Sequence, residues 1–262
     1  MEAVPLGFAL FLLELAVGGI LVTAVLDWDG EVSTGFLSLN AVFLAAFAAG
    51  AVWLRSILPV ARLLRHPVDS ALLQREVAWW VAFTAFAVVQ VVLLRLGRRL
   101  PARIAGSLAG GAGIGALAMS AGAYRAPEGS YLVLLTSLLA GALALGTVWS
   151  GMMLGHWYLV TPRLAPRPLL RLTGALAAVL VAQGLFVYAQ SLGSFAAMQQ
   201  VPQLVVLFWL RTGVGVVFPL ALCFMVWRTA RVRSMMSATG LLYIALGTVL
   251  VGEIIAKALY FI

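Results

Sequence analysis

Eight long apolar stretches are the feature that most constrains the fold of this chain. They cover residues 5–26, 35–58, 77–96, 104–124, 131–159, 169–190, 203–227 and 235–261. About twenty apolar residues are enough to cross the hydrocarbon of a bilayer as a helix. Backbone N–H and C=O groups find no water there, so each stretch must satisfy them internally, as an α-helix does. The pattern predicts an all-α integral membrane protein, an eight-transmembrane-helix bundle that forms a single transmembrane domain of residues 1–262.

Composition narrows the class of protein further. Hydrophobic residues make up 63% of the chain and charged residues 10%, which excludes an ordinary soluble domain. The net charge of +8 comes mostly from arginines between the apolar stretches, so it favours contact with membrane lipid headgroups and not with nucleic acid. Cys223 is the sole cysteine, which excludes a disulfide framework. The first stretch lacks a basic region before it, so we expect a retained helix and not a signal peptide.

The loops between the stretches predict the orientation of the chain. The third, fifth and seventh loops contain ten arginines, and the second, fourth and sixth contain four. Short loops rich in arginine face the cytoplasm. We therefore expect both termini on the outer side. The first loop, with Asp27, Asp29 and Glu31, has no arginine, but acidic residues have little influence on orientation.

The fourth stretch is rich in glycine and reads GSLAGGAGIGALAMSAG. No strand precedes these glycines, so a nucleotide-binding fingerprint is excluded. Gly106 and Gly110, and likewise Gly111 and Gly115, are small residues four positions apart, a spacing that lets membrane helices approach closely. The pattern predicts helix packing at these positions.

Six ionisable residues fall within or at the ends of the apolar stretches, and they form the candidate site. They are Glu14, Arg55, Glu76, Arg211, Glu253 and Lys257. Counted at about 1.5 Å per residue from the predicted outer ends, all six lie in the outer half of the membrane. Charges in hydrocarbon pair with one another or face a wet cavity. The group is therefore either an ion-pair network that holds the helices together or a pocket that handles a ligand or protons.

Two pairings can be stated more closely. Glu253 precedes Lys257 by four residues, the favourable order for an ion pair on one helix face. We also expect Glu14, Arg211 and Glu253 to converge, with Arg211 offsetting at least one carboxylate.

Histidine usage predicts that this chain holds no haem. A transmembrane haem needs two axial ligands, most often histidines from facing helices. Only His156 lies in a stretch, although Met152 or Met153 near it leaves a small opening for a second ligand. Because Trp157 and Tyr158 follow it, we assign His156 to an aromatic belt at the membrane interface.

Four short motifs carry a family resemblance. They are FLLELAVGGIL in the first stretch, AVWLRSILPVAR at the end of the second, SALLQREV before the third and VGEIIAKALYF near the C-terminus. In this order they resemble motifs of the DmsC-type membrane anchor subunits of the DMSO-reductase group, and more broadly of the NrfD-like and polysulfide-reductase anchors. The eight stretches and the outer termini agree with that family.

The resemblance implies a haem-free subunit of a bacterial or archaeal cytoplasmic membrane. Such a subunit oxidises quinol, menaquinol for example, and passes electrons to an iron–sulfur subunit, which supplies a molybdopterin catalytic subunit. The proton acceptor of the family falls on Glu76, and a quinol-site histidine falls on Arg55. Arginine cannot accept a proton at ordinary pH. Either Glu76 acts alone, or Glu14 or Glu253 assists, with Arg211 and Lys257 completing the quinol-binding set.

Without a haem, electrons have no relay across about 30 Å of hydrocarbon. We therefore expect the iron–sulfur subunit to dock on the outer face, over the second, fourth and sixth loops. These loops contain His66, Asp69, Arg125, Glu128 and the Gln199–Gln200 turn.

Two other functions remain open at this point. A transporter would also use charges inside a bundle, and it predicts discontinuous helices and repeat symmetry. A retinal protein would use Lys257, with Glu253 as its counterion. Eight stretches and a lysine so near the C-terminus argue against that alternative.

Overall fold

The structure is a computed structural model that describes residues 4–64, 70–126, 129–161 and 164–261, without the side chains of 193–198 and 261. The residues described contain no strand. Eight helical segments are long and apolar enough to cross a membrane. The predictions of an all-α chain and of eight spans are therefore confirmed.

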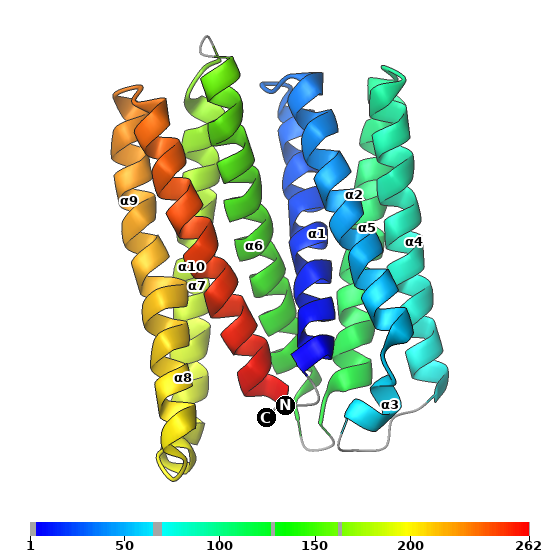
Figure 1. Cartoon of the computed structure of the whole chain (residues 1–262), viewed down its shortest axis with the longest axis vertical. Coiled ribbons are helices and arrows are strands. Elements are labelled where there is room, and N and C mark those ends of the chain that lie inside the picture. Colours follow the sequence, from blue (N-terminus) through cyan, green and yellow to red (C-terminus); the bar gives the residue numbers. More distant parts are fainter. Residues whose placement is uncertain (1–3, 65–69, 127–128, 162–163, 262) are drawn as a thin grey trace. The chain divides into compact units, whose positions relative to one another are not determined.

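The helices follow one another through short connections (Figure 1). Their bounds are α1 Val4–Asp29, α2 Thr34–Ile57, α3 Val60–Leu63, α4 Ser70–Arg95, α5 Arg99–Tyr124, α6 Tyr131–Val160, α7 Arg167–Met198, α8 Pro202–Thr212, the π-helical turn η1 Gly213–Val217, α9 Phe218–Arg231 and α10 Met235–Phe261. The second loop also contains a turn of helix, α3, because Pro59 ends α2 and leaves Leu58 extended.

The third span begins earlier than the sequence predicts. We expected it at residue 77, but α4 begins at Ser70. The intervening segment, SALLQRE, consists mostly of strong helix formers, which continue the helix beyond its apolar part. Glu76 therefore does not stand at the helix start but lies about two turns inside α4.

The apolar run of residues 203–227 predicts one regular helix for the seventh span, but the structure has an interrupted one. A π-helical turn, η1, separates α8 from α9, and the backbone N–H of Phe218 bonds to the carbonyl of Gly213. Pro219 explains the irregularity, because it has no N–H to offer the carbonyl of Gly215, four residues earlier. Such π turns inside α-helices are frequent at functional sites.

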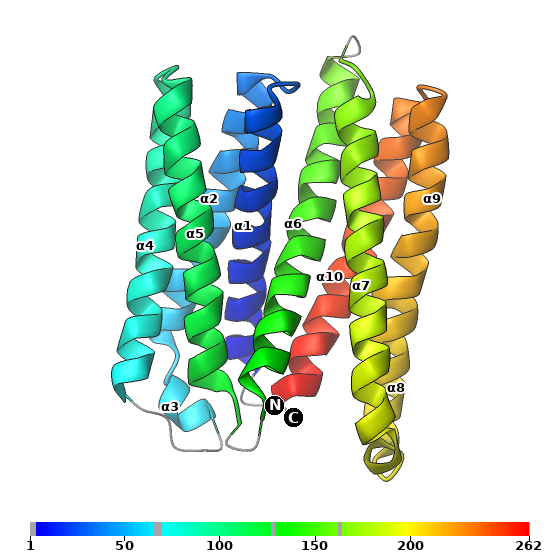
Figure 2. The same ribbon diagram turned by 180° about the vertical axis from the view of Figure 1, so that it is seen from behind.

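Contacts divide the chain into two compact units, residues 1–146 and 147–262. In the first unit α1 packs against α2 and α5, and α4 packs against α2 and α5 (Figure 2). In the second unit α9 packs against α7 and α10, while α8 and η1 also contact α10. The single domain of residues 1–262 and the outer position of the termini stay predictions.

Glycines of α5 act largely as expected. A Cβ added at Gly106, Gly110 or Gly115 would come within 2.8 Å of a side chain of a neighbouring helix. These glycines therefore let α1 and α4 pack closely on α5. Gly111 has nothing within 4 Å of such a Cβ, so its predicted packing role is wrong. The four-residue spacing of small residues indicates that one face of a helix can pack closely. It does not show which face of the helix contacts a neighbouring helix.

Candidate functional site

A buried ion pair joins α2 to α4 in the first unit. Nη2 of Arg55 lies 2.8 Å from Oε2 of Glu76, and Nε of Arg55 donates to the same oxygen at 3.0 Å. Glu76 is fully buried, and the side chain of Arg55 is 9% exposed. Both nitrogens thus converge on one carboxylate oxygen, and hydrogen bonds between charged groups are stronger than neutral ones. Both residues belong to the candidate group that the sequence indicates, and the structure brings them together.

Helix α5 adds a hydroxyl that sequence reasoning missed. Tyr124, 1% exposed, donates a hydrogen bond to Oε1 of Glu76 and accepts one from Nε of Arg55 at 2.9 Å. One signal in the sequence points to Tyr124: it stands at the end of the fourth predicted span, and Arg55 stands near the end of the second, so both are expected on the same side of the membrane. That signal is weak, because tyrosine at a span end normally indicates an aromatic belt.

A second hydroxyl from the same face of α5 completes the surroundings of the carboxylate. Ser120, one helical turn before Tyr124, donates to Oε1 of Glu76 at 3.4 Å, and it accepts a bond of 2.9 Å from the indole of Trp80. The carboxylate thus receives bonds from Arg55, Tyr124 and Ser120. A buried ion pair is tolerated when such bonds satisfy its remaining lone pairs.

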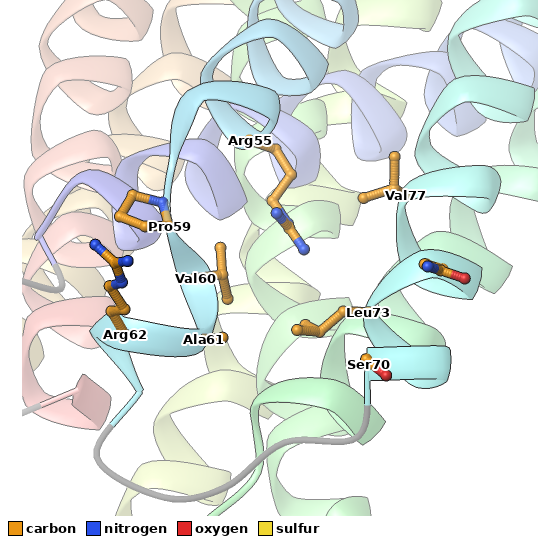
Figure 3. A pocket seen from close by; sticks show the side chains of 9 residues that line it. Arg55, Pro59, Val60, Ala61, Arg62, Ser70, Leu73 and Val77 are labelled. Carbon is orange, nitrogen blue, oxygen red and sulfur yellow. The ribbon is translucent and has the colours of Figure 1, made fainter.

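A cavity of about 720 Å³ lies beside this ion pair. It is lined by Arg55, Pro59, Val60, Ala61, Arg62, Ser70, Leu73, Gln74 and Val77. Figure 3 shows the side chain of Arg55 directed into the space between α3 and α4. Glu76, the partner of Arg55, is not among the residues that line the cavity. No residue in the described part of the chain accepts a hydrogen bond from Nη1 of Arg55, so this nitrogen can donate to a ligand.

The second unit holds a separate buried cluster. Nζ of Lys257 lies 3.1 Å from Oε2 of Glu253, which confirms the pairing that the four-residue spacing predicts. Gln183 of α7 donates to the other carboxylate oxygen, Oε1. All three residues are at most 5% exposed. Sequence reasoning did not find Gln183, because a single glutamine in an apolar helix has no distinctive spacing.

The remaining candidates divide between the two units. Glu14 is fully buried on α1 in the first unit, whereas Arg211 is half-buried in the last turn of α8 in the second. The expected convergence of Glu14 with Arg211 and Glu253 spans both units and stays a prediction. Beside Arg211 in sequence, Thr212 lines a cavity of about 400 Å³ between α7 and α8. Neither Glu253 nor Lys257 lines that cavity.

The loop residues expected at a docking surface are only partly described. His66, Asp69 and Glu128 lie outside the described residues. Arg125, Gln199 and Gln200 are exposed. His156 is exposed as well, while its neighbour Tyr158 is buried and donates to the carbonyl of Ala165. Among the described residues, no group of three or more His, Cys, Asp or Glu side chains could hold a metal ion.

Comparisons of this chain with protein-family models, with curated proteins and with solved structures found no match. The resemblance to the DmsC-type anchors therefore rests on the four short motifs alone.

Proposed function

We propose that this chain is the haem-free membrane anchor subunit of a respiratory oxidoreductase. In this proposal it oxidises a quinol such as menaquinol and passes the electrons to an iron–sulfur partner subunit, which supplies a molybdopterin subunit. The observation that carries the proposal is a guanidinium, Arg55, which is directed into a cavity (Figure 3) and is paired with a buried carboxylate, Glu76.

The cavity has the chemistry that a quinone headgroup needs. Its walls are largely apolar, with Val60, Leu73 and Val77 suited to contact a ring. Small-molecule sites combine such walls with a few polar groups that fix the orientation of the ligand. Arg55 provides a charged donor for a ring oxygen, and the cavity lies at helix ends. A ligand with a polar head and an isoprenoid tail can enter there from the membrane.

Glu76 is the proposed proton acceptor. Oxidation of one quinol releases two electrons and two protons. The electrons go one at a time to the iron–sulfur partner, Glu76 accepts one proton, and water at the open side of the cavity accepts the other. When the headgroup draws hydrogen bonds of Arg55 towards the cavity, an oxygen of Glu76 that Arg55 occupied becomes available to accept a proton. Tyr124, bonded to both residues, holds the carboxylate in place during this exchange.

The test is quinol-driven turnover of the purified complex with Glu76→Gln. This change keeps the shape of the side chain and removes the proton acceptor, so we expect turnover to fall about 10²-fold or more while the complex still assembles. Arg75→Gln is the matched control, because Arg75 is the neighbouring residue on α4, is exposed and does not line the cavity. Turnover of Glu76→Gln equal to that of the parent would contradict the role.

The proposed orientation puts the cavity end of the first unit on the outer side, where the iron–sulfur subunit docks. Single cysteines at Ser130 and Arg98 report on opposite ends of this unit, since they lie before α6 and before α5. We expect crosslinks to the iron–sulfur subunit from position 130. Capture from position 98 alone would overturn the site or the orientation.

A transporter is a second candidate function, and one observation favours it. The π turn η1 interrupts the seventh span and approaches α10 beside Glu253, where Gly215 and Gly252 are in backbone contact. Interrupted helices next to buried charges are typical of transporter binding sites. Counterflow or pH-jump assays in proteoliposomes of the isolated chain distinguish the two, because an anchor subunit moves no solute by itself.

A further inference from the structure

We infer that one end of the second unit binds the headgroup of an anionic phospholipid in preference to that of a zwitterionic one. Helix α7 begins and α9 ends at this end of the unit, and the two helices pack against each other (Figures 1 and 2). The inference concerns a surface that the proposed function does not use. Five exposed arginines lie there, and together they are called the arginine end: Arg167, Arg171, Arg228, Arg231 and Arg233.

No acidic side chain of the second unit lies near the arginine end. Glu253 is the sole Asp or Glu between residues 147 and 262, and it is paired with Lys257. It lies on α10 about five turns beyond the first residue of that helix, a rise of about 27 Å. In the first unit, by contrast, Arg99 and Arg103 lie 2.8 and 3.1 Å from the carboxylate of Asp27. A surface of one charge sign attracts ligands of the opposite sign.

Two arginines of the arginine end lie over aromatic rings. Cζ of Arg231 is 4.5 Å from the ring centre of Trp227, and Cζ of Arg228 is 6.0 Å from that of Phe224. Both rings are exposed. In membrane proteins such rings lie at the level of the lipid headgroups, and arginine extends its charged end towards the phosphates. The ring attracts the charge as a whole, so N–H donors directed away from the ring can bind phosphate oxygens.

The backbone at Arg233 supports a role for its charge. Its φ is +58°, in the left-handed region that favours glycine. Among the described residues the other two with positive φ, each just after a helix, are Gly30 and Gly97. Backbone bonds from the N–H groups of Arg233 and Ser234 close the turn without any side chain. An arginine here therefore costs stability relative to glycine, and what it adds is a surface charge.

A phospholipid fits this surface better than a free phosphate or an acidic protein. The arginines border exposed apolar side chains, including Phe224, Val232 and Met236. A lipid matches both features, because its phosphate binds guanidinium groups and its acyl chains cover the apolar side chains. A free phosphate leaves the apolar side chains uncovered, and a soluble protein does not reach the part of α9 that lies in hydrocarbon. In the predicted orientation this end faces the cytoplasmic leaflet, which is rich in anionic lipid.

The experiment measures the binding of single phospholipids to the detergent-solubilised full-length chain by native mass spectrometry. Phosphatidylglycerol and phosphatidylcholine with identical acyl chains are compared. We expect the first phosphatidylglycerol to bind at least about fivefold more tightly, the contribution of one arginine at a membrane surface.

The variants locate the bound lipid. Arg233→Gly should weaken phosphatidylglycerol binding about fivefold without lowering the melting temperature, because glycine suits the backbone there. Arg231→Gln should weaken it to a similar extent. Arg75→Gln removes an exposed arginine of the first unit and should bind both lipids like the parent. If Arg231→Gln does not fold, Arg233→Gly still decides.

Three results would overturn the inference. The first is equal affinity of the parent for the two lipids, and the second is an equal loss of phosphatidylglycerol binding in Arg75→Gln and Arg233→Gly. The third is competition by glycerophosphoglycerol, the headgroup without acyl chains, at the same concentration as the lipid, which would identify a free phosphate as the ligand. Variants that keep the lipid preference but lose a copurifying subunit would assign the arginine end to an acidic protein instead.

Discussion

The two units each contain a buried ion pair, but the pairs are built differently. In the first unit Arg55 and Glu76 come from separate helices, and Tyr124 of a third helix bonds to both. In the second unit Glu253 and Lys257 share one helical face of α10, and Gln183 ties this pair to α7. The first pair borders a cavity through Arg55.

The difference between a pair within one helix and a pair between two helices determines which of them can respond to a ligand. A pair four residues apart forms wherever the helix forms, so its geometry is local. A pair between helices exists only when those helices are packed in register, so it reports on tertiary structure. Its guanidinium, bordered by a cavity, can also exchange a protein partner for a ligand. The first unit is therefore where we place the ligand chemistry.

The largest effect is expected from Arg55→Met. Removing one partner of a buried pair leaves an uncompensated charge, here that of Glu76, and costs about 3–5 kcal/mol of stability. Thermal unfolding in detergent measures this loss. Adding Glu76→Gln to the same chain should recover part of it, because the carboxylate is then neutral. A double variant no more stable than Arg55→Met would show that the charge is not the cause.

A smaller loss is expected when the tie between helices in the second unit is removed. Gln183→Leu deletes the hydrogen bond to the carboxylate of Glu253 but leaves Lys257 paired with it. Hydrogen bonds to charged groups contribute about 1.5–3 kcal/mol. In the same unfolding assay, Gln183→Leu should lower the stability clearly less than Arg55→Met does. A larger loss would reverse the comparison between the two units.

Backbone packing next to Glu253 gives a third test. A Cβ on Gly252 would lie 2.4 Å from Cα of Gly215, so Gly252→Ala must push η1 away from α10, at about 1–3 kcal/mol. Gly247→Ala is the matched control on the same helix, where nothing lies within 4 Å. We expect the control to unfold at the parent temperature or slightly above it, because alanine favours helix. Equal effects at both positions would exclude a role for this contact.

The smallest stability effect is expected for Tyr124→Phe. The carboxylate of Glu76 keeps its two bonds to Arg55 and its bond from Ser120, so the loss should lie at the low end of the range for bonds to charged groups, about 1.5 kcal/mol. If Tyr124 also positions Glu76 for proton uptake, quinol-driven turnover should fall and its pH profile should shift, whereas KM stays the same. An unchanged profile would leave Tyr124 with a purely structural role.

Much of the fold follows from the sequence because membrane crossing demands long apolar helices. The spans at α1, α2, α6 and α10 lie within a few residues of their predicted bounds. The predicted start of the third span was wrong, because hydropathy identifies the apolar part of a helix and not its polar first turns. The π turn at Gly213 was also missed, although Pro219 inside this apolar stretch was a sequence signal for an interrupted helix.

The site was predictable only in part. Arg55 and Glu76 could be paired from the sequence because both are charged and stand near one end of adjacent spans. Tyr124 and Gln183 could not be found, because which face of a helix meets a carboxylate is decided by packing. That Arg55 lines the cavity and Glu76 does not likewise depends on side-chain directions that hydropathy does not encode.

Photolabelling with an azido-quinone tests the central claim most directly. Membranes containing the chain are labelled, digested and mapped by peptide mass spectrometry, with and without excess unlabelled quinone. The account predicts competed labelling between Arg55 and Val77, around the cavity of the first unit. Competed labelling confined to the cavity between α7 and α8, around Tyr188 and Trp209, would contradict it, as would labelling that excess quinone does not reduce.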